Sequence, residues 1–294
     1  MKTLLIIGGS KFIGKSFVNY FNQFNKFKKL KIKIISRRKI NIKNKKNLSI
    51  IVKKFEKLQK LPKCEYILYC LRSDTVKNDY KLFKIFEKKL VILKKKPKII
   101  FTSSGVLYGN NPKKIKIREN RIIKSKNSAI FQAYKKKWFI QKLNLEKNFY
   151  NLSKKNYKIL ILRMFSFIGP SLLNQTYAPS IFIKSIKKSK KINIKGSLNN
   201  YRSYLHEKDM VEWIITLFFR FKKNYDILNF GSDKAISIYQ LAKLIAKKFA
   251  KKEIILLNKS KKLDYYVPSI GKLKKNFKLK INVSLSNAIK DSIK

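Results

Sequence analysis

The first half of the chain alternates short apolar runs with longer amphipathic stretches. The stretches at 14–27 and 78–96 carry apolar residues at helical spacing and predict helices. The apolar runs are rich in β-branched residues and predict strands at 3–8, 31–36, 48–52, 66–71, 98–104 and 158–164. These runs are almost continuously apolar, which is typical of strands covered on both faces. The alternation therefore predicts an α/β fold with a doubly wound parallel sheet.

The pattern changes after Pro170, where more of the chain is predicted to be helical than to form strands. Apolar residues at helical spacing predict helices at 177–188, 207–221 and 237–250, with Ser237 as an N-cap, and strands at 192–196 and 225–232. The tail from about 252 is poorly patterned, and no element is predicted there. No Gly/Ser linker interrupts the chain. We therefore predict a sheet domain over 1–165 and a smaller α/β part over 166–294 that is interleaved with it.

Composition narrows the class of protein. The 294 residues are 45% hydrophobic, which is enough for a sizeable core. No apolar run is long enough for a membrane span, and the N-terminal run is too short for a signal peptide. Cys64 and Cys70 have no histidine nearby and are expected to be buried free thiols, so no metal site is predicted. These features together predict a cytoplasmic protein.

The charge is extreme, because 72 basic and 15 acidic residues give a formal net charge of +57. Such a charge is typical of proteins that bind nucleic acids or other polyanions. Only eight of the basic residues are Arg, however, and Lys, Ile and Asn are abundant together along the whole chain. All three have A/T-rich codons, so genome-wide drift is the favoured explanation. Nucleic-acid binding stays open as the alternative.

A glycine-rich loop follows the first predicted strand. Gly8, Gly9 and Gly14 stand between that strand and the first predicted helix. Glycine there lets the backbone approach a pyrophosphate, which the free N–H groups of the helix N-terminus then face. Lys11 occupies the position of the expected middle glycine, and its ammonium is a candidate phosphate contact. We predict a dinucleotide site formed by the loop residues Gly8, Gly9, Ser10, Lys11, Phe12, Ile13 and Gly14.

Two arginines follow the second predicted strand. An acidic residue at this point would bind the ribose hydroxyls of NAD, whereas arginine accommodates a 2′-phosphate. Arg37 and Arg38 therefore favour NADP as the cofactor, with NAD as the alternative.

An ordered series of motifs resembles a known family. The series comprises "IIGGSKFIG", "FTSSGVLYGNNP", Tyr134, "LRMFSFIGP", "RSYLHEKD" and "ILNFGSDKAISIYQLAKLIAKKF". It resembles the extended short-chain dehydrogenase/reductase family, which contains NAD(P)-dependent epimerases, dehydratases and reductases of nucleotide sugars. The similarity spans about residues 3 to 250. It implies a Rossmann-type cofactor domain and a smaller C-terminal substrate domain.

The resemblance also implies catalytic residues. Ser104 would hydrogen-bond the sugar, Tyr134 would move the proton, and a lysine four residues later would bind the nicotinamide ribose and lower the pKa of the tyrosine. Trp138 stands at that fourth position, and Lys137 stands at the third. Because Gln141 follows Lys137 at the family's next spacing, Lys137 is the favoured candidate. The alternatives are that the lysine is lost and the protein only binds ligands, or that another lysine replaces it.

Further site residues follow from the resemblance. The implied cofactor contacts beyond the glycine loop are Leu71, Thr102 and Ser103, and Arg72 is unusual beside Leu71. The implied substrate contacts are Ser166, Tyr177 and Arg202, of which Arg202 would grip the nucleotide diphosphate. The single histidine, His206, is expected to be structural. Asp209 is expected to be a helix N-cap or a member of a core ion pair.

Two hypotheses for function therefore remain. The favoured one is an NAD(P)-dependent epimerase, dehydratase or reductase acting on a nucleotide-linked sugar. The alternative is a non-catalytic nucleotide- or RNA-binding protein on the same fold, suggested by Lys11, Trp138 and the charge. The predicted helices around 76–95 and 131–150 are also candidates for a homodimer interface.

Overall fold

The computed structural model describes residues 1–24, 26–41, 47–121, 123, 133–173, 177–194, 197–249, 253–256 and 263–293; the side chains of 133–135 and 256 are not described. The chain divides into two compact units, which are described separately. Unit 1 comprises Met1–Leu107, Ser125–Arg163 and Ile214–Leu228. Unit 2 comprises Tyr108–Lys124, Met164–Trp213 and Asn229–Lys294.

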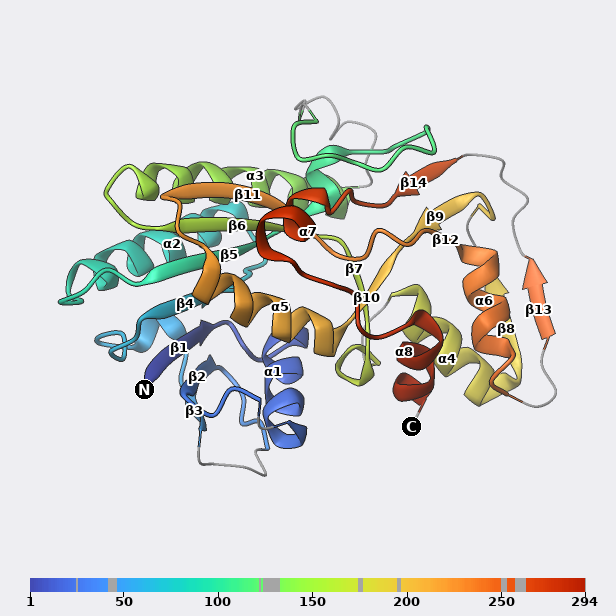
Figure 1. Cartoon of the computed structure of the whole chain (residues 1–294), viewed down its shortest axis with the longest axis horizontal. Helices are drawn as coiled ribbons and strands as arrows, with labels where there is room; N and C mark the ends of the chain where they lie inside the picture. The colour runs from blue at the N-terminus through green and yellow to red at the C-terminus, as the bar shows by residue number, and fades with distance from the viewer. Residues whose placement is uncertain are drawn as a thin grey trace. The chain divides into compact units, whose positions relative to one another are not determined.

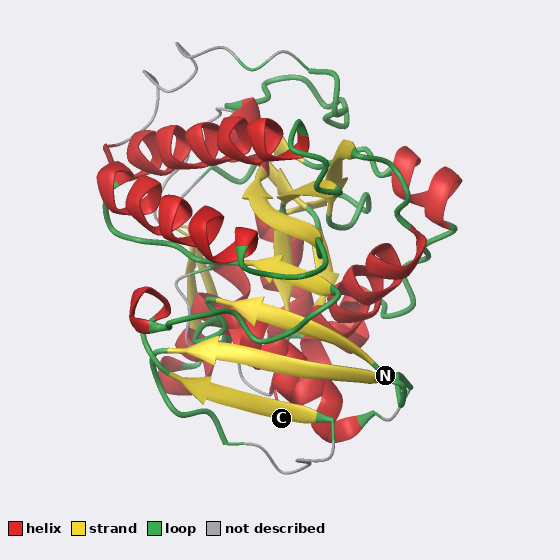
Figure 2. Ribbon diagram, turned by 90° about the vertical axis from the view of Figure 1, so that its left-hand side faces the viewer, coloured by secondary structure: helices red, strands yellow, loops and turns green. Residues whose placement is uncertain are grey.

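Unit 1 is built on a seven-stranded sheet in the order β11-β6-β5-β4-β1-β2-β3. β1 pairs in parallel with both β2 and β4, and β2–β3 and β4–β5 are also parallel. Figure 2 shows the strand that starts beside the N-terminus pointing the same way as its neighbours. The bounds are β1 (Lys2–Ile7), β2 (Leu30–Ser36), β3 (Leu48–Val52), β4 (Tyr66–Tyr69), β5 (Lys98–Ser104), β6 (Ile159–Met164) and β11 (Tyr225–Phe230).

The order of these strands confirms the predicted doubly wound fold (Figure 1). From β1 the chain builds outward to β3 on one side and then returns to build β4, β5 and β6 on the other. The reversal between β1 and β4 is the switch point at which open α/β sheets bind ligands, beyond the carboxyl ends of their strands.

Helices cover both faces of this sheet. They are α1 (Phe12–Gln23), α2 (Val76–Val91), α3 (Ala133–Ser153) and α5 (Glu207–Arg220), whose last turns belong to unit 1. Phe86 and Phe149, from α2 and α3, pack in one core cluster with Ile67 and Ile35 of the sheet. The strand residues one position away face the opposite side, where Ile34 packs against Gly9 of the loop before α1 and Tyr66 packs on Phe218 of α5. Successive residues of a strand thus alternate between two buried faces.

Unit 2 contains smaller sheets and its own helices. β10 pairs with β7, β13 with β8, and β9 lies between β12 and β14. The strands are β7 (Ser166–Ile168), β8 (Lys191–Ile194), β9 (Asn200–Arg202), β10 (Tyr204–His206), β12 (Ile236–Ser237), β13 (Glu253–Leu256) and β14 (Asp264–Tyr266). The helices are α4 (Ala178–Ser189), α6 (Ile238–Ala246), α7 (Gly271–Phe277) and α8 (Leu285–Ile293), and a short 3-10 turn occurs at Pro170–Leu172. In unit 1, short 3-10 turns occur at Phe55–Lys57 and at Gly105–Tyr108, which ends at the first residue of unit 2. Ser237 caps α6 in a capping box with Gln240, as predicted.

The tail from about 252 is ordered into elements that its pattern does not predict. β13 and β14 are short strands that pair with β8 and β9, far away in the sequence. The Nε1–H of Trp213 donates to the Lys280 carbonyl at 3.0 Å, which ties the following segment down. Periodicity predicts no element here because the partner strands of these short segments, and not their own sequence pattern, specify them.

Asp209 also differs from its predicted role. It lies inside the first turn of α5 and not at the N-cap. Its side chain is fully buried, and Oδ2 accepts the backbone N–H groups of Asn282 (3.1 Å) and Val283 (3.0 Å). Asp209 therefore binds two backbone N–H groups of the segment that precedes α8.

The two cysteines are free, with Cys64 buried and Cys70 half-buried. Burial raises the pKa of each thiol to about 12, so neither is a reactive thiolate at neutral pH. Among the described residues, no helix has the length and apolar character required to cross a membrane.

Candidate active site

The glycine loop is packed so closely that side chains have no room. Gly8 has φ of +92°, and a Cβ there would lie 2.8 Å from the backbone of Cys70 and Leu71. A Cβ on Gly14 would lie 1.9 Å from the Gly9 carbonyl oxygen. The N–H groups of Gly8 and Gly9 donate to the Ile35 carbonyl at 3.3 and 3.1 Å. The loop therefore joins the ends of β1, β2 and β4 to the start of α1.

The N-terminus of α1 is available for an anion. Lys11 is the N-cap, but its side chain makes no capping hydrogen bond, and the first turn contains no acidic residue. The first backbone N–H groups of the helix thus keep their partial positive charge for a ligand. Lys11 is exposed, while Ser10, Phe12 and Ile13 are half-buried. A close-packed glycine loop and an uncapped helix start fit a dinucleotide diphosphate.

The two arginines directly follow β2, the strand that binds the glycine loop. The Ser36 hydroxyl donates to the Arg38 carbonyl at 2.7 Å and accepts the Arg38 N–H at 3.2 Å, which forms a tight turn. Arg37 and Arg38 are both exposed. Ile35, one residue before this turn, is the residue whose carbonyl binds the glycine loop. The turn thus begins directly beside the loop.

Three hydroxyl side chains at the end of β5 differ in their hydrogen-bond partners. The Thr102 hydroxyl donates to the Tyr69 carbonyl at 3.2 Å, and the Ser103 hydroxyl donates to Glu146 at 2.5 Å. The Ser104 oxygen accepts the Val106 N–H at 3.3 Å. In the described part of the chain its own hydroxyl proton has no acceptor. Of the three hydroxyl groups, that of Ser104 is therefore the one left to donate to a ligand. Leu71, the other predicted cofactor contact in this region, is half-buried against the core.

A buried ion pair fixes α3 to the sheet. Glu146 accepts from Arg163 through two bonds of 2.8 and 3.1 Å, and both side chains are only about 7% exposed. With the Ser103 bond, the carboxylate has three donors. Such pairing is what allows a charged pair to be buried. Sequence reasoning missed this pair because its members are far apart along the chain.

The first half of α3 carries the tyrosine and lysine candidates. Tyr134 lies in the first turn of α3, and its side chain lies outside the described residues. Lys137 is exposed, and Trp138 is half-buried. The Gln141 amide is buried and donates to the Ser73 carbonyl at 3.3 Å. The predicted pair is therefore divided: Lys137 is exposed to solvent, and Gln141 is buried against the segment after β4.

A lysine that sequence reasoning did not select lies against β5. Lys142 is buried, and its ammonium donates to the Thr102 carbonyl at 2.7 Å. The pKa of Lys142 is lowered to about 8, mainly by burial and in smaller part by the charge of Arg72, while Cys70, Asp79 and Glu146 oppose the shift. In a chain this rich in lysine, no local signal distinguishes one that is buried.

The predicted substrate residues belong to unit 2. Ser166 is half-buried in β7, and Tyr177 is 47% exposed at the N-cap of α4. The Arg202 guanidinium pairs with the Asp264 carboxylate at 2.9 Å and lies 5.5 Å from the ring centroid of Tyr266. Arg202 is thus held by an acidic residue that a diphosphate would have to share or displace.

His206 is buried in β10, and its Nε2 lies 3.1 Å from the Asp291 carboxylate. Burial lowers the pKa of His206, although Asp291 opposes the shift. No group of three or more His, Cys, Asp or Glu side chains in the described ranges could hold a metal ion.

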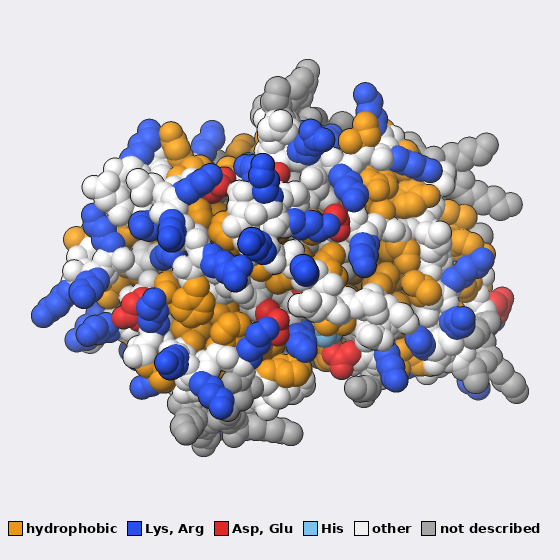
Figure 3. Space-filling model, in the orientation of Figure 1, with side chains coloured by type: hydrophobic (Ala, Val, Ile, Leu, Met, Phe, Trp, Pro, Cys, Tyr) orange, Lys and Arg blue, Asp and Glu red, His pale blue; other side chains and the backbone are white. Residues whose placement is uncertain are grey.

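Basic side chains show no concentration on the face drawn in Figure 3. Lys and Arg are scattered over that face among apolar and uncharged side chains. A scattered distribution is what drift in composition produces, whereas nucleic-acid sites gather basic residues into a patch or stripe.

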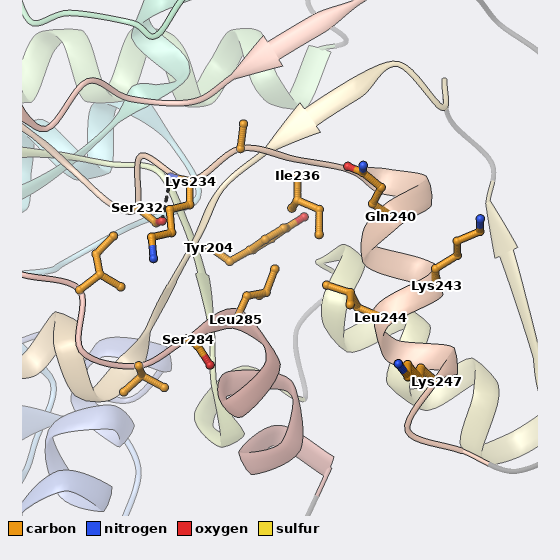
Figure 4. A pocket seen from close by; sticks show the side chains of 13 residues that line it. Tyr204, Ser232, Lys234, Ile236, Gln240, Lys243, Leu244, Lys247, Ser284 and Leu285 are labelled. Carbon is orange, nitrogen blue, oxygen red and sulfur yellow. Dashed lines mark hydrogen bonds between the residues drawn. The ribbon is translucent and has the colours of Figure 1, made fainter.

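Unit 2 also contains a cavity of about 490 Å³ with an apolar lining and a lysine rim (Figure 4). Tyr204, Ile236 and Leu285 line it, and Lys243 and Lys247 extend from α6 and its end. None of its lining residues belongs to the glycine loop.

The fold and the loop define unit 1 as a dinucleotide-binding unit of the doubly wound class. A model of the NAD-dependent epimerase/dehydratase family matches residues 4–231. The chain belongs to this family.

Solved structures support the same fold at low sequence identity. UDP-N-acetylglucosamine 4-epimerase from Methanobrevibacter ruminantium, in complex with UDP-N-acetylmuramic acid, is 19% identical with a TM-score of 0.76 over 99% of this chain and 97% of the other. UDP-glucose 4-epimerase from Stenotrophomonas maltophila, with bound NAD and a formylated UDP-arabinopyranose, is 13% identical with a TM-score of 0.80 over 100% and 97%. The NAD-dependent NDP-hexosamine 5,6-dehydratase TunA is 13% identical with a TM-score of 0.78 over 100% and 97%. No curated protein matches the chain.

Proposed function

We propose that this protein is an NAD(P)-dependent enzyme that epimerises, dehydrates or reduces a nucleotide-linked sugar by hydride transfer. The observation that carries the proposal is the glycine loop, packed without room for side chains against an uncapped helix start at the switch point of the sheet. The family membership and the sugar-nucleotide ligands of the similar structures support it.

The cofactor would be held by this chain's backbone and a few side chains. The loop from Gly8 to Gly14 and the first turn of α1 would hold the diphosphate, and Leu71, Thr102 and Ser103 would line the strand ends beside it. When bound, the nicotinamide accepts a hydride from the sugar or returns one to it.

Proton transfer would fall to Tyr134 and Ser104. Ser104 has a hydroxyl proton available to polarise a sugar oxygen, and Tyr134 would remove or supply the proton on that oxygen. Lys137 is the lysine that the sequence places nearest the family's position. Its exposed side chain would have to fold back along α3 to act.

The sugar nucleotide would be bound by unit 2 through Ser166, Tyr177 and Arg202. Arg202 has the fork geometry that suits a diphosphate, and its Asp264 partner keeps it oriented. The Tyr266 ring beside the guanidinium supports the same orientation.

NADP is the proposed cofactor, because Arg37 and Arg38 are exposed directly after β2 and no acidic residue stands there. A fluorescence titration with NADPH and NADH at moderate salt tests this. Selective binding of NADPH is expected. Equal binding would contradict the role of the two arginines, and binding of neither would favour the RNA-binding alternative.

A homodimer is proposed on α2 and α3. These two helices expose the apolar side chains Tyr80, Val91, Ile140 and Tyr150. Sedimentation analysis is expected to give twice the chain mass of 34.8 kDa.

The catalytic proposal is tested by Tyr134→Phe. Turnover of a panel of UDP-sugars should be lost while NADPH binding is retained, because only the phenolic hydroxyl group is removed. Tyr150→Phe is the matched control, since Tyr150 lies on the same helix and is 45% exposed. Unchanged turnover in Tyr134→Phe would refute the proton-transfer role.

A further inference from the structure

Arg72 and Trp138 form a contact that the proposed function does not yet use. The Arg72 guanidinium lies over the Trp138 ring, 4.6 Å from its centroid. Arg72 is exposed, and within the described part of the chain its guanidinium forms no hydrogen bond or ion pair. The indole Nε1–H is buried and has no hydrogen-bond partner among the described residues. Because buried donors are rarely left unpaired, this one calls for an explanation.

The contact lies after β4, which begins the half of the sheet expected to hold the nicotinamide. Arg72 comes three residues after β4, and the preceding residues Cys70 and Leu71 pack against Gly8 of the loop. The α1 half of a dinucleotide fold holds the adenosine side, with its ribose at the end of β2. A dinucleotide that leaves the glycine loop therefore passes the end of β4, beside Arg72, on its way to the second half.

None of the other described cations on α3 is shown in contact with Trp138. Lys142 is buried, and its ammonium is bound to the Thr102 carbonyl. Lys136 and Lys137 are exposed. Trp138 itself occupies the position four residues after Tyr134. The cation that lies over this position is Arg72.

We propose that Arg72, held against Trp138, is the cation that binds the nicotinamide ribose, in place of a lysine on α3. This inference rests on the proposed cofactor site. Stacking on the indole restricts the guanidinium while leaving its N–H donors free for the ribose oxygens. Trp138 thereby becomes the residue that positions the cation.

Calorimetric titration with NADPH and with ADP tests the proposal. Arg72→Ala should weaken NADPH binding by about 10–100-fold, the loss expected for charge-assisted hydrogen bonds. ADP lacks the nicotinamide ribose, so its affinity should change by less than about twofold. Arg118→Ala is the matched control, because Arg118 is exposed in unit 2 and should change neither affinity.

A second variant separates the contact from a general effect on folding. In Arg72→Ala combined with Trp138→Lys, the new ammonium stands four residues after Tyr134. This double variant should recover most of the NADPH affinity lost in Arg72→Ala. Circular dichroism spectra should be the same for all variants.

The outcomes distinguish this inference from the proposed function. A wild-type chain that binds neither NADPH nor ADP would overturn both. A wild-type chain that binds both, with Arg72→Ala leaving NADPH affinity unchanged or weakening ADP equally, would overturn the role of Arg72 alone. Failure of the double variant to recover binding would also overturn it.

Discussion

The starts of α1 and α3 belong to the same unit and carry the two halves of the candidate cofactor site, but they are built differently. At α1 the ligand is offered backbone N–H groups and a loop that excludes side chains. At α3 the ligand is offered individual side chains. Among these, Trp138 stands where the family's pattern has a lysine. A site made from backbone survives large changes in composition, because any residue supplies an N–H group.

At this half, Arg72 reaches α3 from the segment after β4 and lies over Trp138. Lys142 and Arg72 both lie near the end of β4, and the positive charge of Arg72 helps lower the pKa of Lys142. The departure from the family's pattern at Trp138 can therefore be interpreted only together with Arg72, which packs on it.

The largest expected effect is on the attachment of α3. Glu146→Ala removes the carboxylate that pairs with the buried Arg163 guanidinium and should lower the free energy of unfolding by about 3–5 kcal/mol. Chemical denaturation measures it. Glu87→Ala is the control, because Glu87 pairs with the exposed amines of Lys84 and Lys155 and should cost less than about 1 kcal/mol. Similar losses for the two variants would contradict the buried pair.

The next effect tests the backbone half. Gly14→Ala places a Cβ 1.9 Å from the Gly9 carbonyl and should lower the free energy of unfolding by about 3 kcal/mol, because the loop must shift. NADPH binding should fall as well. Gly271→Ala is the control, since the nearest atom to its Cβ is a side-chain oxygen at 3.8 Å. A stable Gly14→Ala protein that binds normally would show that the packing is not needed.

A smaller effect of opposite sign is expected at Lys142. Its pKa is about 8 in the folded chain and 10.5 ordinarily, so the unfolded chain binds more protons between these values. Stability from this group therefore rises with pH from about 8 to 10.5, and its burial penalty is largest below pH 8. Lys142→Met should raise the free energy of unfolding at pH 7 by about 1–2 kcal/mol, less than the shift implies because the bond to Thr102 is lost.

Denaturation at several pH values checks the prediction. The gap between Lys142→Met and wild type should narrow as the pH rises through this window. Lys147→Met, which changes an exposed lysine on the same helix, should leave the pH dependence unchanged. A gap that stays constant with pH would contradict the lowered pKa.

The smallest effect tests whether the α1 N-terminus is free for a ligand. Lys11→Ser supplies the capping oxygen that Lys11 lacks, and should raise the stability of the unliganded chain by about 0.5–1 kcal/mol. NADPH binding should weaken, because the new hydroxyl competes for the same N–H groups and one ammonium is gone. Tighter binding in the variant would show that the phosphates lie elsewhere.

Much of unit 1 follows from the sequence alone. The predicted strands at 48–52 and 98–104 match β3 and β5 residue for residue, and the other predicted strands of the sheet fall within a few residues of those observed. The glycine loop lies where its spacing places it. Apolar periodicity and glycine spacing are local properties of the sequence. A strand buried on both faces is apolar at nearly every position, whereas an amphipathic helix is apolar on one face only.

The tertiary structure alone decided the rest. β13 and β14 are defined by their partner strands, Lys142 by its burial against Thr102, and Arg202 by its pairing with Asp264. The stacking of Arg72 on Trp138 joins residues 66 positions apart. In a chain with so many basic residues, the identity of a lysine or arginine carries little information. Its partner and its burial decide what it does, and these are set only when distant segments pack together.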